Sequence, residues 1–380
     1  FIFYKTKNWK SIDKESMCNS KRYNEDFIKI LGELYNIMTR KGEPFRARAY
    51  KKAEETIIEY TDDITEPSQL KGLPGIGPTI LDKLDEFVKT GTLQAIEKEK
   101  NNPLNILTKI YGVGPKKAQD FINAGVTTIK EMRDQQDKLK LTAAQKVGLK
   151  HFDDIEKRIP RKEIEDFEKE FTKIFNKVVP PESTFDIVGS YRRGAKDSGD
   201  IDIIITNKNN DRDAFDNVLD NLIKDNIITD VLSRGKTKSL TMVQINKDLP
   251  FRRVDFLYTP PKEYPFALLY FTGSKIFNTI IRQKALNKKL TLNEHGLSHM
   301  NKGVKGDKLE QEFQDEKTIL NFLGIEYKNP EERIDARSVV MIDDKKSNPG
   351  DPDIKEISLI IKPTKKNTTL KKSMNLSSDT

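Results

Sequence analysis

The chain has 380 residues, enough for two or three globular units that each bury a core. Apolar residues make up 36% of the sequence and charged residues 33%, and the mean hydropathy of −0.66 is typical of several small, rather polar domains. The formal net charge of +8 favours a polyanionic partner or an acidic membrane surface, and charge alone does not choose between them.

Cysteine usage and hydropathy narrow the class of protein. The single cysteine, Cys18, excludes an internal disulfide and a multi-cysteine zinc site, and three histidines leave little material for a histidine-rich metal centre. No run approaches the roughly 18–20 apolar residues that a membrane span needs, so no membrane partner is expected. The sequence therefore predicts an intracellular protein that is not secreted.

The expected elements fall into a helical front and a mixed back. Residues 1–19 show no clear period, whereas from residue 20 to about residue 178 apolar residues recur at spacings of three and four, which predicts helices. Later, four segments rich in β-branched residues predict strands: Thr184–Val188, Asp200–Thr206, Leu240–Ile245 and Val254–Leu257. Ile276–Asn287 again predicts a helix. Residues after about 332 are expected to be weakly ordered, with one strand at Glu356–Ile361. The fold class is therefore multidomain α and α+β.

Two similar glycine turns interrupt the helical front. Residues 73–78 read LPGIGP and residues 111–117 read YGVGPKK, and each turn precedes a helix. Glycine allows a tight turn, proline suits the first turn of a helix, and the helix N-terminus offers free N–H groups to a phosphate oxygen. One such turn is usually an ordinary loop, but two copies resemble helix-hairpin-helix motifs, which hold the DNA backbone without reading bases.

Three aspartates form a candidate metal site. Residues 199–205 read GDIDIII, so on a strand Asp200 and Asp202 share one face while the isoleucines between them bury the other. Residues 252–256 read RRVDF and place Asp255 on one face of a second strand. An Asp-x-Asp pair alone is usually a solvated strand edge. Three aspartates on neighbouring strands, however, could hold two Mg²⁺ ions, one activating a hydroxyl and the other binding a triphosphate.

The surrounding motifs resemble a known family. GSYRRG at residues 189–194, before GDIDIII, resembles the nucleotidyltransferase signature, which also occurs in enzymes that extend RNA ends. YFTGS at residues 270–274 and the paired glycine turns are similar to family X DNA polymerases of the beta type, and the resemblance runs from about residue 20 to about residue 332. The abundance of Lys, Asn and Ile is typical of an AT-rich genome, such as that of a large DNA virus.

The resemblance implies a polymerase site. Asp200, Asp202 and Asp255 match the ligands of two Mg²⁺ ions, with Mn²⁺ as a substitute, and Arg253 matches a partner of these carboxylates. Arg282 matches a minor-groove contact to the template strand. The residues that match the pocket for the incoming dNTP are Arg158, Gly189, Ser190, Arg193, Gly199, Tyr270, Phe271, Gly273 and Asn278.

The resemblance also implies a second site in the helical front. Lys83 matches the lysine that forms a Schiff base with a 5′-deoxyribose phosphate and removes it by β-elimination. Basic residues usual in that pocket are here Phe45, Thr79 and Ala95, which weakens the case for this lyase activity. A monovalent cation, Na⁺ or K⁺, is expected at the two hairpins on the backbone carbonyls of Lys71, Leu73, Ile76, Thr108, Ile110 and Val113.

The expected organisation follows the family. It comprises an N-terminal extension (1–19), an all-helical lyase domain with the first helix-hairpin-helix motif (20–98), and a DNA-binding subdomain with the second (99–160). A beta-type palm with a nucleotidyltransferase fold (161–261), an α+β nucleotide-selection subdomain (262–332) and a weakly ordered tail (333–380) complete it.

The implied function is gap-filling DNA synthesis in base excision repair. The expected partner is gapped or nicked duplex DNA with a 5′-phosphate, bound by a monomer in the nucleus, a viral replication compartment or a virion. Lysine and arginine contacts to phosphates predict binding that weakens steeply with salt. Two rivals remain: a nucleotidyltransferase acting on RNA ends, and a DNA-end-binding scaffold without catalysis.

Overall fold

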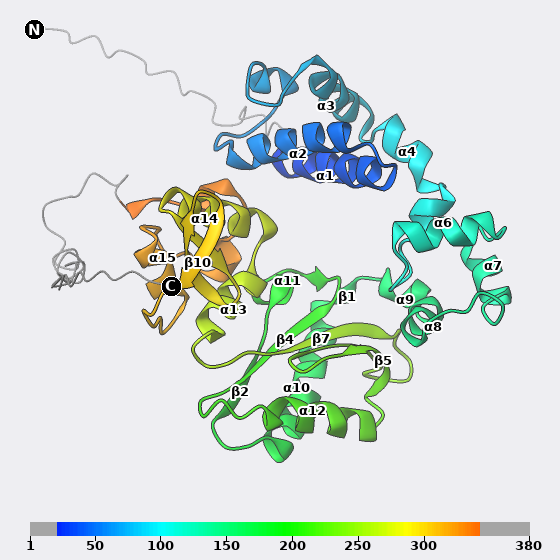
Figure 1. Cartoon of the computed structure of the whole chain (residues 1–380), viewed down its shortest axis with the longest axis vertical. Coiled ribbons are helices and arrows are strands. Elements are labelled where there is room, and N and C mark those ends of the chain that lie inside the picture. The colour runs from blue at the N-terminus through cyan, green and yellow to red at the C-terminus, as the bar shows by residue number, and fades with distance from the viewer. Residues whose placement is uncertain (1–20, 343–380) are drawn as a thin grey trace, which may run out of the picture.

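The computed structural model describes residues 21–342, and the chain doubles back on itself (Figure 1). It runs from the blue helices at the top through the cyan helices to the green sheet at the bottom, and returns to the yellow and orange elements beside the first helices. The first and last parts of the described chain are therefore neighbours, and helices α2 and α14 are in contact.

The first unit is helical. It consists of α1 (Asn24–Arg40), α2 (Pro44–Glu59), the short 3₁₀ helix η1 (Pro67–Leu70), α3 (Pro78–Thr90) and α4 (Gln94–Lys100). The apolar residues at spacings of three and four form the predicted buried face, and α1 and α2 pack closely. The core of this unit includes Phe27, Leu31, Leu34, Ile57, Ile64, Leu70 and Leu84.

The second unit is also helical and has its own core. Its helices are α5 (Pro103–Leu107), α6 (Pro115–Asn123), α7 (Ile129–Asp134), α8 (Ala143–Lys150) and α9 (Phe152–Ile155). The buried residues of this core include Leu107, Ile110, Ala118, Phe121, Val126 and Met132. Helix α8 contacts strand β5 (Ile228–Arg234) of the next unit, where the Nε2 of buried His151 lies 2.7 Å from Asp230 Oδ2.

The third unit is built on a five-stranded sheet with the order β2-β4-β7-β6-β5. Strands β4 and β7 are parallel, and the other neighbouring pairs are antiparallel. The strands are β2 (Ser183–Ile187), β4 (Ile201–Asn207), β5, β6 (Lys238–Val243) and β7 (Arg252–Tyr258). The unit also contains β1 (Ile159–Pro160), α10 (Arg161–Val178), α11 (Gly189–Arg192), β3 (Asp197–Ser198) and α12 (Asp213–Lys224).

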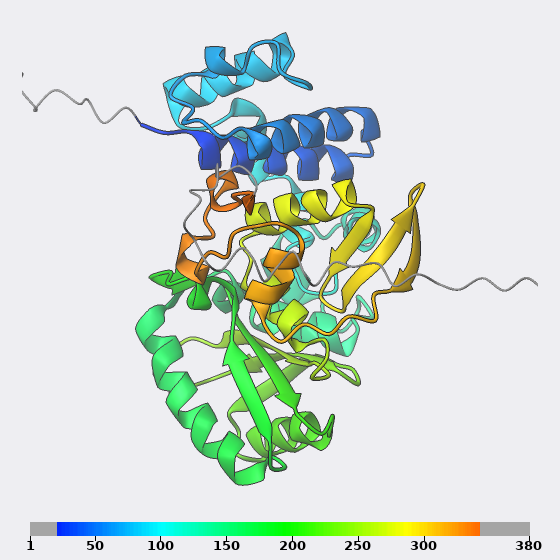
Figure 2. The same cartoon turned by 90° about the vertical axis from the view of Figure 1, so that its left-hand side faces the viewer.

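The two faces of this sheet have different roles. Helices α10 and α12 cover one face, where Ile201, Ile203, Val254 and Phe256 are buried (Figure 2). Because side chains alternate along a strand, the residues between them point to the opposite face, which carries the aspartates. The opposite face therefore carries the aspartates beside a smaller buried apolar cluster of Val188, Ile204 and Ala267.

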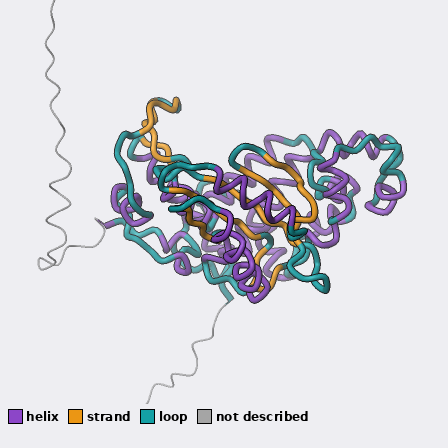
Figure 3. Tube along the Cα trace, turned by 90° about the horizontal axis from the view of Figure 1, so that it is seen from below, coloured by secondary structure: helices purple, strands orange, loops and turns teal. Residues whose placement is uncertain are grey.

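The last unit combines helices with a three-stranded sheet in the order β10-β9-β8. The hairpin of β9 and β10 projects from the body of the chain (Figure 3). The elements are α13 (Tyr264–Thr272), α14 (Lys275–Asn287), β8 (Leu290–Asn293), β9 (Gly296–Asn301), β10 (Val304–Lys308), α15 (Glu316–Phe322), η2 (Pro330–Glu332) and η3 (Ala336–Ser338). The predicted multidomain α and α+β fold class is confirmed.

The start of the expected tail needs correction. Weak order was expected from residue 333, but Arg333 is fully buried, Asp335 caps η3, and Met341 bridges to Ile325. Arg333 donates to Glu316, which explains why this polar stretch is packed. The strand expected at Glu356–Ile361 and the extension 1–19 lie outside the described residues. Within residues 21–342, no helix is both long and apolar enough to cross a bilayer.

Candidate active site

Three carboxylates meet at the parallel pair of strands. The register places Asp202 of β4 opposite Asp255 of β7, and Asp200 immediately precedes β4. One carboxylate oxygen from each of the three aspartates lies within 4.8 Å of the other two. The structure therefore brings together the three residues that the sequence nominated as metal ligands.

Gly189 allows the turn before α11 to approach these carboxylates. Its φ is +64°, in the left-handed region that favours glycine, and a Cβ there would lie 2.8 Å from Asp202 Oδ2. The adjacent backbone N–H of Val188 donates to the carbonyl of Asp202 at 2.9 Å. A side chain at residue 189 would displace the Asp202 carboxylate.

Burial and mutual repulsion shape the charges of the cluster. Burial, followed by the charges of Asp200 and Asp255, raises the pKa of the Asp202 carboxyl to about 7. Burial also raises the pKa of Asp255. Arg253 offsets part of this repulsion, because its guanidinium donates to Asp200 and its Nε lies 3.3 Å from Asp255 Oδ1.

The residues present fit a divalent metal ion. The Nε of Arg253 lies at ion-pair distance from Asp255 Oδ1 but not in hydrogen-bonding geometry, so this buried oxygen has no hydrogen-bond donor among the described residues. Hard oxygen ligands suit Mg²⁺, and a cation among three carboxylates would favour their ionised forms. Asp200, Asp202 and Asp255 can therefore hold a divalent cation.

The residues expected near a triphosphate lie next to this cluster. Ser190 of α11 donates to Ser198 Oγ at 2.7 Å, and Arg193 follows the helix. Arg193 Nη1 donates to the carbonyl of Thr272 at 2.5 Å, which joins this turn to the end of α13. Burial lowers the pKa of the Arg193 guanidinium, and the negative charge of Asp202 partly offsets this effect.

A second set of expected residues surrounds the junction of α13 and α14. Asn278 Nδ2 donates to the carbonyl of Tyr270 at 2.6 Å, and the rings of Tyr270 and Phe271 meet edge to face with centroids 5.2 Å apart. Gly273 has φ +68°, and a Cβ there would lie 3.3 Å from Arg193 Nη1. Arg282 is exposed one turn beyond Asn278 on α14.

Arg158 and Gly199 form a pair of their own. Arg158 Nη2 donates to Asp197 Oδ1 at 2.6 Å and to the Asp197 carbonyl at 3.0 Å. A Cβ on Gly199 would lie 3.3 Å from Arg158 Nη1. In this structure Arg158, which was expected to bind a phosphate, is therefore paired with Asp197.

The two glycine turns have matching geometry. The N–H of Ile76 donates to the carbonyl of Leu73, and the N–H of Val113 donates to the carbonyl of Ile110, both at 3.0 Å. The central glycines have φ of +78° at Gly75 and +77° at Gly112. Each turn leads into a helix that begins with proline. The other two residues whose carbonyls were expected to bind a monovalent cation precede the turns: Lys71 is the C-cap of η1 and Thr108 is the C-cap of α5.

Lys83 lies in the first helical unit, apart from the carboxylates. It is half-buried on α3, between the apolar positions Ile80 and Leu84. Within residues 21–342 its side chain has no hydrogen-bond or ion-pair partner. Phe45, which replaces an expected basic residue, is 80% exposed beside Arg48, whose guanidinium lies 4.9 Å from the ring centroid.

Two groups of residues near the site were not nominated from the sequence. Arg192 donates to Thr272 Oγ1 at 2.6 Å and to both oxygens of Glu316, at 3.1 and 2.8 Å. Arg192 belongs to the GSYRRG motif, so the sequence could have nominated it. Its partner Glu316, 124 positions away, could not be found in this way. Lys238 lies on β6 opposite Leu257 and faces Asp202 and Asp255 closely enough to influence both.

The fold and the carboxylate cluster define the class of protein: a polymerase-type palm joined to helical units that carry paired glycine turns. Comparison with family models agrees along most of the chain. The matches are a helix-hairpin-helix domain at residues 22–93, the fingers domain of DNA polymerase lambda at 105–156, the DNA polymerase beta palm at 158–261 and the DNA polymerase beta thumb at 267–334.

Curated relatives point the same way. The chain is 32% identical to DNA polymerase lambda of Arabidopsis thaliana over 337 residues, covering 82% of this chain and 62% of the relative. It is 30% identical to DNA polymerase lambda of Rattus norvegicus, covering 80% and 55%, and 28% identical to DNA nucleotidylexotransferase of Xenopus laevis, covering 83% and 68%. The chain thus spans between about half and two thirds of the length of these relatives. It belongs to family X of the DNA polymerases and is similar to the beta and lambda types.

Proposed function

We propose that the chain is a template-directed DNA polymerase that adds one deoxynucleotide at a time to a primer 3′-hydroxyl in a short gap. The observation that carries the proposal is the cluster of Asp200, Asp202 and Asp255 at the parallel strands of a beta-type palm. A gapped or nicked duplex with a 5′-phosphate is the proposed substrate, because two consecutive helical units each carry a glycine turn that leads into a helix N-terminus suited to a phosphate.

The residues divide the work of phosphoryl transfer. Two Mg²⁺ ions bound by the carboxylates would supply Lewis-acid activation of the hydroxyl and neutralise the charge of the triphosphate. Asp255 orients the primer 3′-hydroxyl. Arg253 partly neutralises the negative charge of Asp200 and Asp255. Ser190 and Arg193 donate to the triphosphate, and Arg158 joins them once Asp197 releases it.

Selection of a deoxynucleotide is assigned to the end of α13 and the start of α14. Tyr270 and Phe271 place their rings and backbone where a 2′-hydroxyl would be crowded, and Asn278 braces Tyr270. Arg282 contacts the template strand from the exposed face of α14. Backbone carbonyls of the two hairpins hold Na⁺ or K⁺ against the DNA phosphates.

Template direction and sugar selection test this function against its rivals. With a gapped duplex, the incorporated base should follow the template, and dNTP should be preferred to rNTP. Addition without regard to the template would indicate an activity like that named for the Xenopus relative. Preference for RNA ends would indicate an RNA-end nucleotidyltransferase, and binding without Mg²⁺-dependent addition would indicate a scaffold.

We also propose 5′-deoxyribose-phosphate lyase activity at Lys83, in the service of base excision repair. Lys83 is half-buried and has no partner among the described side chains, so its amine is accessible for Schiff-base formation with a C1′ aldehyde. Helix α2 supplies two further candidate donors to a 5′-phosphate, Arg46 and Tyr50, and Arg46 is paired with Glu43 at 2.9 Å.

Borohydride trapping tests the lyase separately from the polymerase. A DNA with a 5′-deoxyribose phosphate should become covalently attached to the wild-type chain in the presence of borohydride, and Lys83→Ala should abolish the adduct. Lys89→Ala, on the exposed last turn of the same helix, is the matched control and should still form it. An adduct that persists in Lys83→Ala would assign the nucleophile elsewhere.

A further inference from the structure

An ion pair joins the first helical unit to the start of α14. Glu54 of α2 is 1% exposed, and its Oε1 accepts a hydrogen bond from Lys275 Nζ at 2.9 Å. Its other oxygen, Oε2, accepts from Lys51 Nζ, one turn earlier on α2, also at 2.9 Å. A buried carboxylate of the first unit is thus shared between its own helix and a helix 221 positions further along the chain.

The position of Glu54 is fixed by close packing. Helix α1 passes so near that a Cβ on Gly32 would lie 3.3 Å from Glu54 Oε1. A carboxylate with almost no access to water has few alternatives to the partners that it has, because leaving it unpaired carries a large desolvation penalty. Lys275, by contrast, is 71% exposed, so the buried partner determines where the two groups meet.

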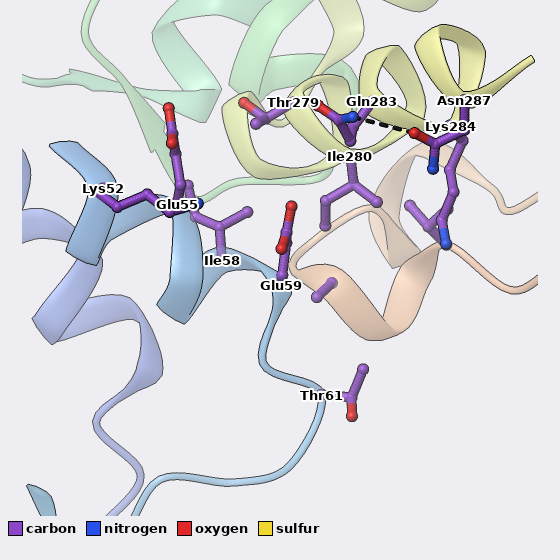
Figure 4. Close-up of a pocket in the computed structure, with 12 residues that line it drawn as sticks. Lys52, Glu55, Ile58, Glu59, Thr61, Thr279, Ile280, Gln283, Lys284 and Asn287 are labelled. Carbon is purple, nitrogen blue, oxygen red and sulfur yellow. Dashed lines mark hydrogen bonds between the residues drawn. The ribbon is translucent and has the colours of Figure 1, made fainter. Parts of the chain in front are cut away.

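Other contacts hold the same two parts of the chain together. Arg22 Nη2 donates to Asp335 Oδ2 at 2.7 Å, and Arg337 Nη1 donates to Asp63 Oδ1 at 3.0 Å. Between α2 and α14 lies a cavity of about 550 Å³, lined by both helices (Figure 4). The Glu54–Lys275 pair therefore acts together with these ionic contacts across an incompletely packed interface.

Lys275 is placed to transmit this contact to the nucleotide pocket. It is the first residue of α14 and directly follows Gly273 and the N-cap Ser274. Asn278 lies three positions further on, on the same side of the helix, and donates to the carbonyl of Tyr270. The chain of contacts thus runs from Glu54 through the first turn of α14 to the residues assigned to the nucleotide.

We propose that Glu54 is a positioning residue of the nucleotide pocket, contributed by the first helical unit through Lys275. The inference rests on the proposed polymerase function and adds that its nucleotide pocket is complete only when the first unit is docked on α14. Glu54 touches neither substrate nor metal, so its loss should weaken nucleotide binding rather than slow the chemical step.

Single-nucleotide gap filling tests the proposal. Glu54→Gln should raise the KM for dNTP by about tenfold, as expected for coupled residues in contact, while kcat stays within about twofold of the wild type. Lys275→Met, a change at an exposed residue that leaves Lys51 as a partner of Glu54, should give the same result. The double variant should be no worse than either single one, and Lys275→Arg should restore the wild-type KM.

The matched control is Lys51→Met, which removes the partner of Glu54 on its own helix and leaves the contact with Lys275. Its KM for dNTP should not change. An unchanged KM in both Glu54→Gln and Lys275→Met, or effects that simply add in the double variant, would overturn the proposal. If the wild type adds no nucleotide at all, the proposed function itself fails and the inference fails with it.

Discussion

Asp202 of β4 and Asp255 of β7 lie directly opposite each other across the parallel strands of the palm. Like charges in register destabilise a sheet, so the pair is costly to the metal-free fold. The cost is expressed in the pKa of Asp202, which burial and the charges of Asp200 and Asp255 raise to about 7. A fold that keeps such a pair points to a bound cation.

The first prediction concerns pH and the metal-free protein. Because the pKa of Asp202 is about 7 when folded and roughly 3.9 when unfolded, its contribution to the free energy of unfolding is present below about pH 4 and is lost as pH rises to about 7. The charged groups that influence it are Asp200, Asp255, Arg253 and Lys238.

Urea unfolding between pH 4 and pH 8 in the presence of EDTA measures this effect. Asp202→Asn should not lose free energy of unfolding as the pH rises, so it should be more stable than the wild type at pH 8. Mg²⁺ should stabilise only the wild type. Parallel stability curves for the two proteins across this range would contradict the electrostatic account.

A second prediction concerns the buried network around Glu316. Burial opposes the ionisation of Glu316, but hydrogen bonds from Arg192 and Arg333 outweigh it and lower the pKa. The stabilisation is therefore present above the unfolded pKa of roughly 4.3 and is lost as pH falls through the lower folded pKa. Glu316→Gln should destabilise the protein by about 3 kcal/mol at pH 7, since it leaves buried guanidinium groups without their charge partner.

Thermal or urea unfolding measures this change, and the difference should shrink at pH 3. Glu312→Gln is the control, because Glu312 pairs with Lys262 while both side chains remain 69% and 78% exposed. Its effect on the free energy of unfolding should be much smaller, because both groups of this pair remain in contact with water. Equal effects of the two substitutions would remove the special role of the buried network.

A third prediction separates stability from DNA binding in the first hairpin. Gly75 has φ +78°, and a Cβ there would lie 2.8 Å from Lys52 Cγ, so Gly75→Ala should cost roughly 1–2 kcal/mol of stability. Gly77 is the N-cap of α3 with nothing within 4 Å of its Cβ position. Gly77→Ser should leave stability unchanged, since serine suits an N-cap, and should weaken binding of gapped DNA by obstructing the approach of a phosphate.

Fluorescence anisotropy with gapped DNA, beside thermal unfolding, measures both quantities. An unchanged DNA affinity in Gly77→Ser would argue against phosphate contact at this turn.

A fourth prediction concerns Leu257, which lies two residues after Asp255 on strand β7. Leu257 is half-buried on the face of β7 that carries Asp255, and it packs with Val188, Ile204 and Ala267. Leu257→Arg would place a cation beside the metal-binding carboxylates and should change the frequency of misincorporation while templated addition persists. Misincorporation equal to that of the wild type would count against an influence of this position on the carboxylate cluster.

The carboxylate cluster could be predicted from the sequence because local periodicity determines it. Alternation along β4 and β7 places Asp202 and Asp255 on one face whenever the isoleucines face the core. The four expected strands are present with ends shifted by one or two residues. The glycine turns were predicted for a similar reason, since backbone conformations with positive φ demand glycine at fixed positions.

Elements and contacts without a local pattern could not be predicted. Strand β5 lies at the edge of its sheet with Asp230 and Ser233 interrupting its apolar residues, and β10 is exposed along its whole length. The pairs Arg192–Glu316 and Glu54–Lys275 join residues far apart in the chain, and only the packed structure brings them together. The burial of Arg333 also depends on a distant partner, Glu316, so the sequence after position 332 did not predict it.

The most direct test of the account is single-nucleotide filling of a one-nucleotide, 5′-phosphorylated DNA gap with Mg²⁺, comparing the wild type with Asp255→Ala. Asp248→Ala, at an exposed position outside the cluster, is the control. The account predicts templated addition of one dNMP by the wild type and the control, and loss of addition in Asp255→Ala. Full activity of Asp255→Ala, or no addition by the wild type, would contradict it.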